Sequence, residues 1–242
     1  MDRSILPVQA ASVGLMIGEH KLLSDISFSI NRFDRLMILG ANGSGKSLLL
    51  RVLHGLVKPS SGHVNWARSE PNTSQAMVFQ RPVLLRRSVV DNIRFALTIS
   101  APQHNPDALA RDALAKVGLL SIAQRPARLC SIGEQQRIAL ARAWAVKPEV
   151  LFLDEPTASL DPTATKGVEE IIKAMHEAGT TIVMATHDLS QARRLGDRCL
   201  LLHRGEIIDD VRSESLFNPN RDMKNHQHGA TINAFIKGDL LW

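Results

Sequence analysis

A glycine-rich octapeptide near residue 40 constrains the fold more than any other feature of this sequence. The residues Gly40, Ala41, Asn42, Gly43, Ser44, Gly45, Lys46 and Ser47 match the pattern G-x-x-x-x-G-K-[ST] at every fixed position. An apolar run of strand length, 36–39, precedes them, and a run of helical character, 47–56, follows. Glycines let several backbone N–H groups point at one anion, and the helix adds its positive dipole end. We therefore expect a phosphate-binding loop inside an α/β fold.

The chemistry of a phosphate loop assigns roles to its side chains. Lys46 is expected to reach the β- and γ-phosphates of a nucleoside triphosphate, and the Ser47 hydroxyl is expected to bind Mg²⁺. The backbone from Gly40 to Leu48 is expected to wrap the phosphates. A glycine-rich turn that merely precedes a helix is the alternative, and the strand and helix on either side argue against it.

A second signal is an apolar strand that ends in two carboxylates. The run 150–153 is followed by Asp154 and Glu155. Ligands of open α/β sheets bind at the carboxyl ends of the strands. Asp154 is expected to hold Mg²⁺, and Glu155 to orient and deprotonate an attacking water. A strand followed by an ordinary acidic turn is the alternative, which the phosphate loop makes less attractive.

Composition sets the class of protein. The chain has 242 residues, a net charge of +5, 44% hydrophobic and 22% charged residues, which are values of a globular protein. It has no apolar run of about 18 residues, and its first fourteen residues do not resemble an export signal, so we expect a chain that does not itself span a membrane. Cys130 and Cys199 are not in a CxxC pair, which argues against a metal cluster and predicts reduced thiols.

The order of apolar runs predicts the architecture. Buried strands are expected at 36–39, 77–79, 150–153, 182–185 and 199–202, with an alternating antiparallel strand at 26–30 and a hairpin turn at 203–206. Helical patterns punctuated by Pro82, Pro102, Pro106 and Pro126 predict a lobe over 81–145. The fold class is therefore α/β: a mostly parallel sheet, an N-terminal antiparallel β subdomain and an inserted helical lobe. A polar surface loop at 217–228 precedes a short helix whose one face carries Ile232, Phe235 and Ile236.

These motifs together resemble the nucleotide-binding subunit of ABC transporters, over nearly the whole chain. Gln80 matches the Q-loop, Ser131-Ile132-Gly133 resembles the signature motif, Asp161 matches the D-loop and His187 matches the switch histidine. The resemblance implies a P-loop NTPase as one ABC ATPase domain, 1–242, with a nucleotide-binding core at 1–80 and 146–215, a helical lobe with the signature at 81–145 and a tail at 216–242.

The resemblance also implies a mechanism. The cofactors are ATP and Mg²⁺, with Ser47, Gln80 and Asp154 at the metal. Lys46, Gln80, Glu155 and His187 are the catalytic residues. Two chains, a homodimer or a pair with a paralogue, hold each ATP between the phosphate loop of one and Ser131, Gly133 and Asp161 of the other. A surface role for Gln80 or His187 and a helix cap at Asp161 are the alternatives, and Asp161 could do both.

Two positions depart from the family pattern. Ile132 stands where the signature usually has glycine, and a positive φ there would strain its branched side chain. Cys130 stands where leucine is usual. The family commonly stacks adenine on an aromatic ring, but the aligned residue is Ile17, and the chain has no tyrosine. We therefore expect an active but slower ATPase with loose selectivity for the base.

The resemblance further implies partners and a place in the cell. A polytopic membrane permease and, indirectly, a solute-binding protein would accompany the chain at the cytoplasmic face of the inner membrane. Leu84, Leu85, Val89 and Ile93 are expected to receive the permease, with Arg81, Arg86 and Arg87 beside them. The local sequences at 53–56 and 79–82 are similar to those of the tungstate branch of oxyanion importers.

Two other readings remain open. A soluble ABC-type ATPase acting on nucleic acid or ribosomes is the alternative function, but the chain lacks sustained heptads, cysteine clusters and a second such domain. The positive net charge without a clustered motif is weak evidence for nucleic acid. His226 and His228 could bind a metal, although the pair lacks further ligands and more plausibly belongs to a solvated loop.

Overall fold

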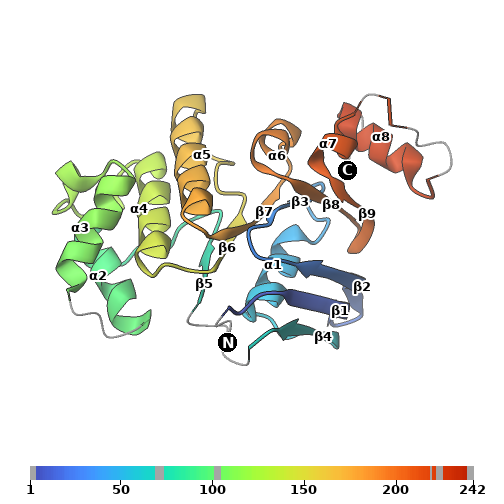
Figure 1. Cartoon of the computed structure of the whole chain (residues 1–242), viewed down its shortest axis with the longest axis horizontal. Helices are drawn as coiled ribbons and strands as arrows, with labels where there is room; N and C mark the ends of the chain where they lie inside the picture. The colour runs from blue at the N-terminus through green and yellow to red at the C-terminus, as the bar shows by residue number, and fades with distance from the viewer. Residues whose placement is uncertain (1–3, 69–73, 101–104, 219, 222–225, 239–242) are drawn as a thin grey trace. The chain divides into compact units, whose positions relative to one another are not determined.

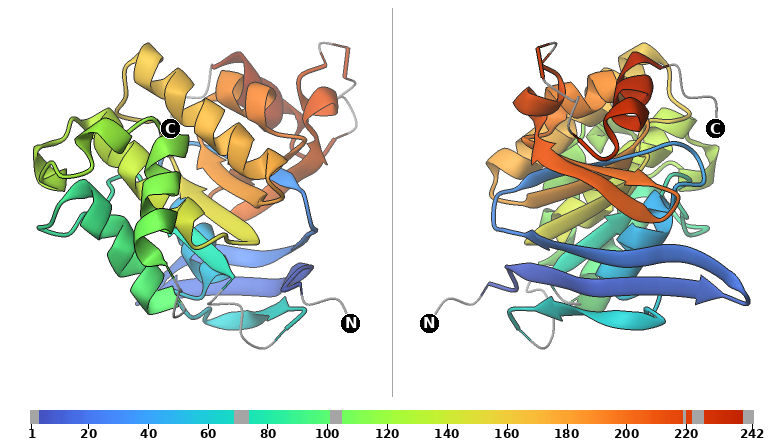
Figure 2. Two further views of the ribbon diagram at one scale, coloured as in Figure 1. Left: turned by 60° about the vertical axis from the view of Figure 1, so that its left-hand side comes forward. Right: turned by 90° about the vertical axis from the view of Figure 1, so that its right-hand side faces the viewer.

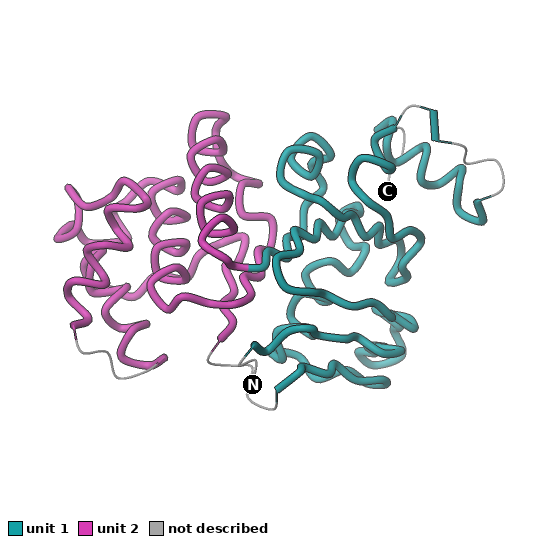
Figure 3. The backbone as a smooth tube through the Cα atoms, viewed as in Figure 1, with its two compact units in different colours: residues 1–69, 181–242 teal, residues 70–180 magenta. Residues whose placement is uncertain are grey.

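The fold was determined as a computed structural model, which describes residues 4–68, 74–100, 105–218, 220–221 and 226–238 (Figure 1). The chain divides into two compact units, 1–69 with 181–242 and 70–180 (Figure 3). Pro102 and, within the expected surface loop, residue 219 and residues 222–225 lie outside the described residues. Among the described residues, no helix is both long and apolar enough to cross a bilayer.

The sheet of the first unit positions its functional loops. Its strands lie in the order β7 (Thr181–Thr186), β3 (Arg35–Leu39), β8 (Arg198–His203) and β9 (Glu206–Arg212). The first three run parallel, and β9 returns antiparallel to β8. Residues 36–39 and 182–185 are all buried, as expected for strands covered on both faces. The predicted parallel core and its two strand positions are thus confirmed here.

An antiparallel sheet forms the N-terminal part of the same unit. Its strands lie in the order β2 (His20–Ile30), β1 (Val8–Ile17) and β4 (Ser61–Trp66). The alternation at 26–30 identified β2 correctly, but β1 and β4 were not predicted. In β1 the register shifts several times, and Ser12 has a φ of 47°. Such bulges interrupt the period of two on which strand prediction depends.

Helix α1 (Lys46–His54) lies between this antiparallel sheet and the parallel strands (Figures 1 and 2). Leu49, Leu50 and Leu53 are at most 1% exposed and fill that layer. Burial of each such side chain stabilises the fold by about 2 kcal/mol. The helix ends at Gly55, whose φ of 85° supports a backbone C-cap. Packing on both sides thus fixes the helix that begins at the glycine-rich loop.

The turn of the predicted hairpin occurs between β8 and β9. Arg204 and Gly205 occupy it with φ of 48° and 79°, which is the pair of left-handed residues that a two-residue hairpin turn requires. After β9 follow α7 (Ser213–Leu216) and α8 (Gly229–Lys237). The predicted tail helix is therefore present, with Ile232 fully buried and Phe235 and Ile236 half-buried.

The second unit, 70–180, carries the helical lobe. It contains β5 (Gln75–Val78), α2 (Val89–Ser100), α3 (Pro106–Lys116), α4 (Ile132–Ala145), β6 (Val150–Asp154) and α5 (Pro162–Glu177), with short 3₁₀ turns at Leu120–Ile122 and Ala127–Leu129. β5 and β6 pair in parallel, and α2, α3 and α4 pack on one another. Pro106 begins α3 behind the capping side chain of Asn105. Pro106 therefore marks the start of a helix of the lobe, as predicted.

Candidate active site

The loop after β3 folds around its own lysine. Lys46 is only 4% exposed, and its ammonium donates hydrogen bonds to the carbonyl oxygens of Gly40 (2.8 Å) and Ala41 (2.9 Å). The loop therefore holds a buried positive charge at the N-terminus of α1, where the helix dipole also favours an anion.

Glycines make this close folding possible. A Cβ at Gly40 would lie 2.3 Å from the carbonyl oxygen of Leu202 and 2.5 Å from the hydroxyl of Ser44. Gly45 has a φ of 106°, which only glycine adopts readily, and it begins α1 without a side-chain cap. The first N–H groups of α1 are consequently not taken by a capping side chain, as an anion site requires.

The hydroxyl of Ser44 provides a direct test of whether the loop fits phosphates. Ser44 is 4% exposed, and its Oγ has no hydrogen-bond partner within the described part of the chain. Leaving a buried hydroxyl unpaired costs about 1–3 kcal/mol. The hydroxyl lies against Gly40 inside the curl of the loop, where a phosphate oxygen would satisfy it. The loop therefore fits a phosphate group.

The same unit brings His187 to the edge of the sheet where the loop lies. β3 and β7 run parallel, and Leu39 pairs with Thr186, so Gly40 and His187 follow neighbouring strand ends. The Thr186 hydroxyl accepts a hydrogen bond from the Asp188 N–H (3.1 Å), and Asp188 caps α6 (Leu189–Leu195). His187 is exposed at this turn. His187 therefore follows the strand next to the one that leads into the loop, and its contact with a γ-phosphate stays a prediction.

Ile17 lies at the tip of the β1–β2 hairpin. It is 59% exposed, and its neighbour Met16 is 51% exposed. Ile17 pairs with His20 across a turn in which Gly18 has a φ of 60°. Two exposed apolar side chains at a hairpin tip can cover the face of a base, although neither has a π-system.

The second unit gathers its predicted residues at one edge of its own strands. Because Val78 of β5 pairs with Leu153 of β6, Gln80 and the pair Asp154 and Glu155 leave the sheet at the same edge. Asp154 is 3% exposed, Glu155 is half-buried and Gln80 is exposed. The structure thus brings together the predicted metal-binding residues of this unit and the predicted base.

Glu155 has an unusual backbone. Its φ is 46°, and the next residue is Pro156. A left-handed conformation for a residue with a Cβ costs about 1–2 kcal/mol, and such strain concentrates at functional sites. This strain was not predicted from the sequence, because no local pattern distinguishes Glu155 from an ordinary residue of an acidic turn. It supports the role assigned to Glu155 independently of the motif.

Ser131 begins α4 as part of a capping box. The Ser131 hydroxyl accepts a hydrogen bond from the Glu134 N–H (3.3 Å), and the Glu134 carboxylate accepts one from the Ser131 N–H (2.7 Å). The bond from the Ser131 N–H holds the pKa of the Glu134 carboxyl below its ordinary value. Glu134 was not among the predicted functional residues, although the spacing S-x-x-E is a known capping signal.

The structure corrects the expectation of strain at Ile132. Ile132 is the first helical residue of α4, and it is not among the described residues with positive φ. A branched side chain fits such a backbone without strain, so the departure from glycine leaves the loop intact. The Ile132 side chain is 59% exposed, and the Cys130 side chain beside it is buried.

Gly133 and Asp161 both have structural roles, and their predicted contacts with ATP stay predictions. A Cβ at Gly133 would lie 3.1 Å from the Cβ of Ala164, so this glycine allows α4 and α5 to approach closely. Asp161 caps α5, accepting hydrogen bonds from the N–H groups of Thr163 and Ala164 at 2.9 Å. The capping alternative for Asp161 is therefore confirmed.

The expected docking residues of the lobe need correction. Leu84, Val89 and Ile93 are at most 6% exposed, because they form the core of the lobe. The assignment came from the resemblance, which does not tell whether a given side chain of this lobe points inward. Leu85, the fourth expected residue, is half-buried. The large apolar side chains that the lobe exposes include Val83 (71%), Phe95 (37%) and Ile99 (69%). A partner that docks on the lobe would meet the exposed set.

One histidine of the tail, His226, lies near a buried acidic side chain. Asp209 is 5% exposed and forms an ion pair with Arg221 (2.8 Å), and the His226 Nε2 lies 3.7 Å from it. The rings of His226 and His228 are 6.5 Å apart. Within the described ranges, no three His, Cys, Asp or Glu side chains are placed to hold a metal ion. The described part of this loop is therefore tied to β9.

Comparison with known proteins gives a consistent assignment. The family model described as ABC transporter matches residues 23–158. The chain is 31% identical to a probable anion import ATP-binding protein of Haloferax volcanii, covering 99% of this chain and 90% of the relative. It is 33% identical to the arginine transport ATP-binding protein ArtM of Bacillus subtilis, covering 87% of this chain and 93% of the relative.

Solved structures agree with the sequence matches. The cbiO1 protein from Clostridium perfringens, part of the ABC transporter complex cbiONQ, has a TM-score of 0.79 and 26% identity, over 93% of this chain and 98% of its own. A dimeric ATP-binding cassette in a post-hydrolysis state with ADP and Pi has a TM-score of 0.76 and 27% identity, over 85% of this chain and 98% of its own. The α/β P-loop NTPase fold with an antiparallel N-terminal sheet and a helical insert is therefore confirmed.

Proposed function

Because the chain belongs to the ABC transporter family and is an ATPase that uses ATP and Mg²⁺, we propose that it powers the import of a solute through a separate membrane permease. The observation that carries the ATPase assignment is the phosphate loop, with its buried Lys46, its uncapped helix start and the unpaired hydroxyl of Ser44. Each of these features is costly in an empty loop and is compensated by bound phosphates.

The proposed reaction transfers the γ-phosphoryl group of ATP to water. The Glu155 carboxylate takes a proton from the water, whose oxygen forms a bond to the γ-phosphorus as the bond to the bridging oxygen breaks, giving ADP and phosphate. Lys46 and the N–H groups of the loop bind the phosphates, and His187 contacts the γ-phosphate. Bound Mg²⁺ would neutralise phosphate charge; Ser47, Gln80 and Asp154 are its proposed ligands.

A pair of chains is the proposed working unit, either two copies or one copy with a paralogue. Ser131 and Gly133 of one chain then contact the ATP held by the phosphate loop of the other, with Asp161 nearby. The similarity to a dimeric ATP-binding cassette supports this arrangement. The Ser131 hydroxyl accepts a bond from Glu134 and keeps its own proton to donate to a phosphate oxygen.

The membrane partner is proposed to dock on the helical lobe, so that the chain works peripherally at the cytoplasmic face of the inner membrane. Val83, Phe95 and Ile99 are among the exposed apolar residues of the lobe. The Arg87 guanidinium lies 5.2 Å from the centre of the Phe95 ring, which adds a positive charge to this surface. Permease acids could pair with it.

The solute is proposed to be an oxyanion such as tungstate. The similarity to a probable anion import protein supports an anion. A relative of comparable identity is named for arginine transport, so the choice needs its own experiment. The chain would be assembled with its permease and a solute-binding protein in vesicles. Tungstate, phosphate and arginine would then be compared for stimulation of ATP hydrolysis. Stimulation by tungstate above the other two supports the proposal, and stimulation by arginine alone rejects it.

The ATPase mechanism is tested by Glu155→Gln, which keeps the size of the side chain but removes the base. Hydrolysis is expected to fall by a factor of about 10² or more, and ATP is expected to trap two chains together. Light scattering measures the mass, and release of phosphate measures the rate. Glu170→Gln, an exposed carboxylate on α5, is the matched control. A Glu155→Gln variant that stays single and keeps wild-type turnover would overturn the assignment.

A further inference from the structure

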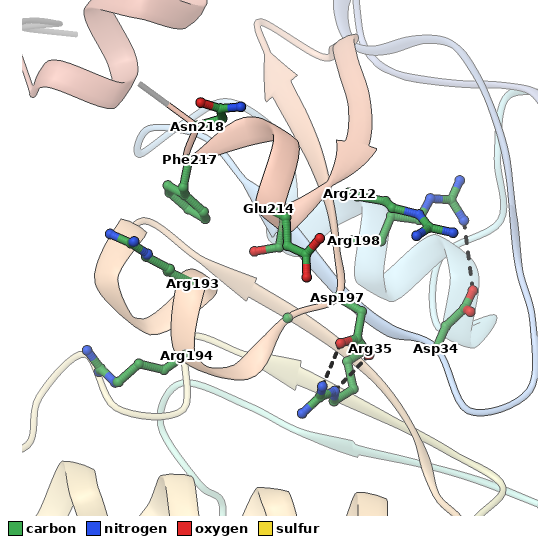
Figure 4. Close-up of a pocket in the computed structure, with 12 residues that line it drawn as sticks. Asp34, Arg35, Arg193, Arg194, Asp197, Arg198, Arg212, Glu214, Phe217 and Asn218 are labelled. Carbon is green, nitrogen blue, oxygen red and sulfur yellow. Dashed lines mark hydrogen bonds and ion pairs between the residues drawn. The ribbon is translucent and has the colours of Figure 1, made fainter. Parts of the chain in front are cut away.

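A second pocket lies at the opposite edge of the sheet from the phosphate loop. It has a volume of about 930 Å³ and opens beside α6 and α7 (Figure 4). Its wall includes Arg35, the first residue of β3, whereas the phosphate loop follows the last residue of that strand. The five residues of β3 separate the two sites by roughly 15 Å. The pocket is therefore distinct from the active site.

The lining of this pocket is strongly basic. Five arginines and three acidic residues line it, which leaves an excess of two positive charges. The acidic residues are Asp34, Asp197 and Glu214. The arginines that line it are Arg35, Arg193, Arg194, Arg198 and Arg212. The guanidinium is the side chain best matched to phosphate, because its fork of N–H groups binds two oxygens at once.

Two of the arginines are fixed parts of the wall. Arg35 donates two hydrogen bonds to Asp197, at 2.8 and 2.5 Å. Arg198 donates two to Asp210, at 2.6 and 2.5 Å, and a third to the carbonyl oxygen of Ser29. In each pair the two charges neutralise one another, and the pairs hold the first residues of β3 and β8 in place. They are not available as the main ligands of an anion.

Arg193 and Arg212 are different. Within the described part of the chain, neither has a hydrogen bond or an ion pair to another side chain, and both are exposed. Figure 4 shows them on either side of the pocket, with Glu214 between them. Their guanidiniums point away from each other in this view, but both residues line the cavity and have rotatable side chains that can turn toward a ligand. A ligand with several negative oxygens would be favoured there, because neither charge is neutralised by a partner within the described residues.

A half-buried aromatic ring completes the lining. Phe217 follows α7, and its N–H donates to the carbonyl oxygen of Ser213, which holds the residue at the pocket wall. An aromatic ring beside cationic side chains is the combination that binds the base and the phosphates of a nucleotide. Glu214 can accept a hydrogen bond from an amino group of the base or a hydroxyl of the ribose.

We propose that this pocket is a second nucleotide site, which binds the phosphates of a nucleoside diphosphate or triphosphate through Arg193 and Arg212 and its base against Phe217. The volume is within the range of small-ligand sites. An acidic peptide would use the arginines but has no need of the ring. The inference does not depend on hydrolysis at the phosphate loop.

The stoichiometry of nucleotide binding tests the proposal. Equilibrium dialysis with ADP and, separately, with GDP is expected to give two molecules bound per wild-type chain for at least one of the two nucleotides. The double variant Arg193→Gln, Arg212→Gln is expected to bind one, and Lys46→Ala is expected to keep the one that the double variant loses. Because neither arginine has a side-chain partner among the residues that the structure describes, the double variant should fold. Arg111→Gln, an exposed arginine on α3 outside the pocket, is the matched control.

The result has distinguishable outcomes. If the wild-type chain binds one nucleotide, if Lys46→Ala abolishes that binding and if the double variant binds as wild type does, the second site is overturned. The proposed function is then left intact. If the wild-type chain binds one nucleotide and only the double variant abolishes that binding, the pocket is supported as a nucleotide site. The phosphate loop is then rejected as one. The contact between the base and Phe217 is tested separately, with tripolyphosphate as a ligand without a base and with a Phe217→Ala variant. Tripolyphosphate binding as tightly as the nucleotide, with no loss in Phe217→Ala, would reject the base contact. A tenfold lower affinity of the Phe217→Ala variant for the nucleotide would support the base contact.

Discussion

Ser131 and Glu134 cap one another at the start of α4, each accepting a hydrogen bond from the backbone of the other. The bonds satisfy two N–H groups that the helix itself leaves unpaired. They also place a carboxylate at the helix end where the signature serine would meet a phosphate. Ser131 and Glu134 thus stabilise the lobe and set the charge near the proposed contact with the ATP of the other chain.

Replacing Glu134 with alanine is expected to lower the free energy of unfolding by about 1 kcal/mol, because one half of the capping box is lost. Glu134→Gln keeps a side-chain acceptor and should lose less. Urea titrations measure both. A Glu134→Ala variant as stable as wild type would show that the reciprocal bonds contribute nothing.

The pH dependence of this contribution follows from its sign. The folded-state pKa of Glu134 is lowered, chiefly by the bond from the Ser131 N–H, so its stabilisation is complete above the unfolded-state value and is lost as pH falls through the folded value. The difference in stability between wild type and Glu134→Gln should therefore shrink in acid, below about pH 4. A difference that grows in acid would contradict the assignment.

Glu155 combines strain with chemistry, and the two can be separated. Glu155→Gly removes the Cβ that makes a φ of 46° unfavourable, so we expect the free energy of unfolding to rise by about 1 kcal/mol while hydrolysis is abolished. Glu155→Gln keeps the strain and should leave stability within about 0.5 kcal/mol of wild type. Thermal and urea unfolding of the two variants make the comparison. Equal stability of both would mean that the backbone is not strained in solution.

Ile132 begins α4 with a helical backbone, so Ile132→Gly relieves no strain. We expect the hydrolysis rate to stay within about threefold of wild type and the stability to fall by about 0.5–1 kcal/mol, the entropic effect of glycine in a helix. Ile132→Ala, which keeps a good helix former, is the control. A tenfold faster Ile132→Gly enzyme would show that the side chain obstructs the trans contact.

Ile17 tests how the base is held. Ile17→Tyr adds a ring at an exposed hairpin tip, and stacking is worth about 1 kcal/mol beyond burial, so ATP should bind roughly fivefold more tightly. Ile17→Leu changes shape without adding a ring and should leave affinity unchanged. Fluorescent-nucleotide titrations distinguish the two. If Ile17→Tyr bound ATP no better than Ile17→Leu, the base would not contact this position.

Local patterns predicted the parts of the fold whose residues are constrained by their neighbours in sequence. The loop after β3, the hairpin turn at Arg204 and Gly205, and the ends of β6 and β7 all follow from glycine positions and buried apolar runs. β1 escaped prediction because bulges break its alternation. The lobe residues Leu84, Val89 and Ile93 were expected on the docking surface but are buried, because an apolar residue type does not by itself distinguish a core position from an exposed one.

The sequence by itself therefore determined the phosphate loop, the acidic strand end and the class of fold, since each depends on contiguous residues whose backbone needs are local. Only the tertiary structure decided which apolar faces are buried, that Leu39 lies beside Thr186, that Glu155 is strained, and that Arg193 and Arg212 share a pocket with Phe217. These relations arise from strand pairing and packing between segments distant in the chain. Non-local contacts of that kind are fixed by the whole core and leave no signature in any one stretch of residues.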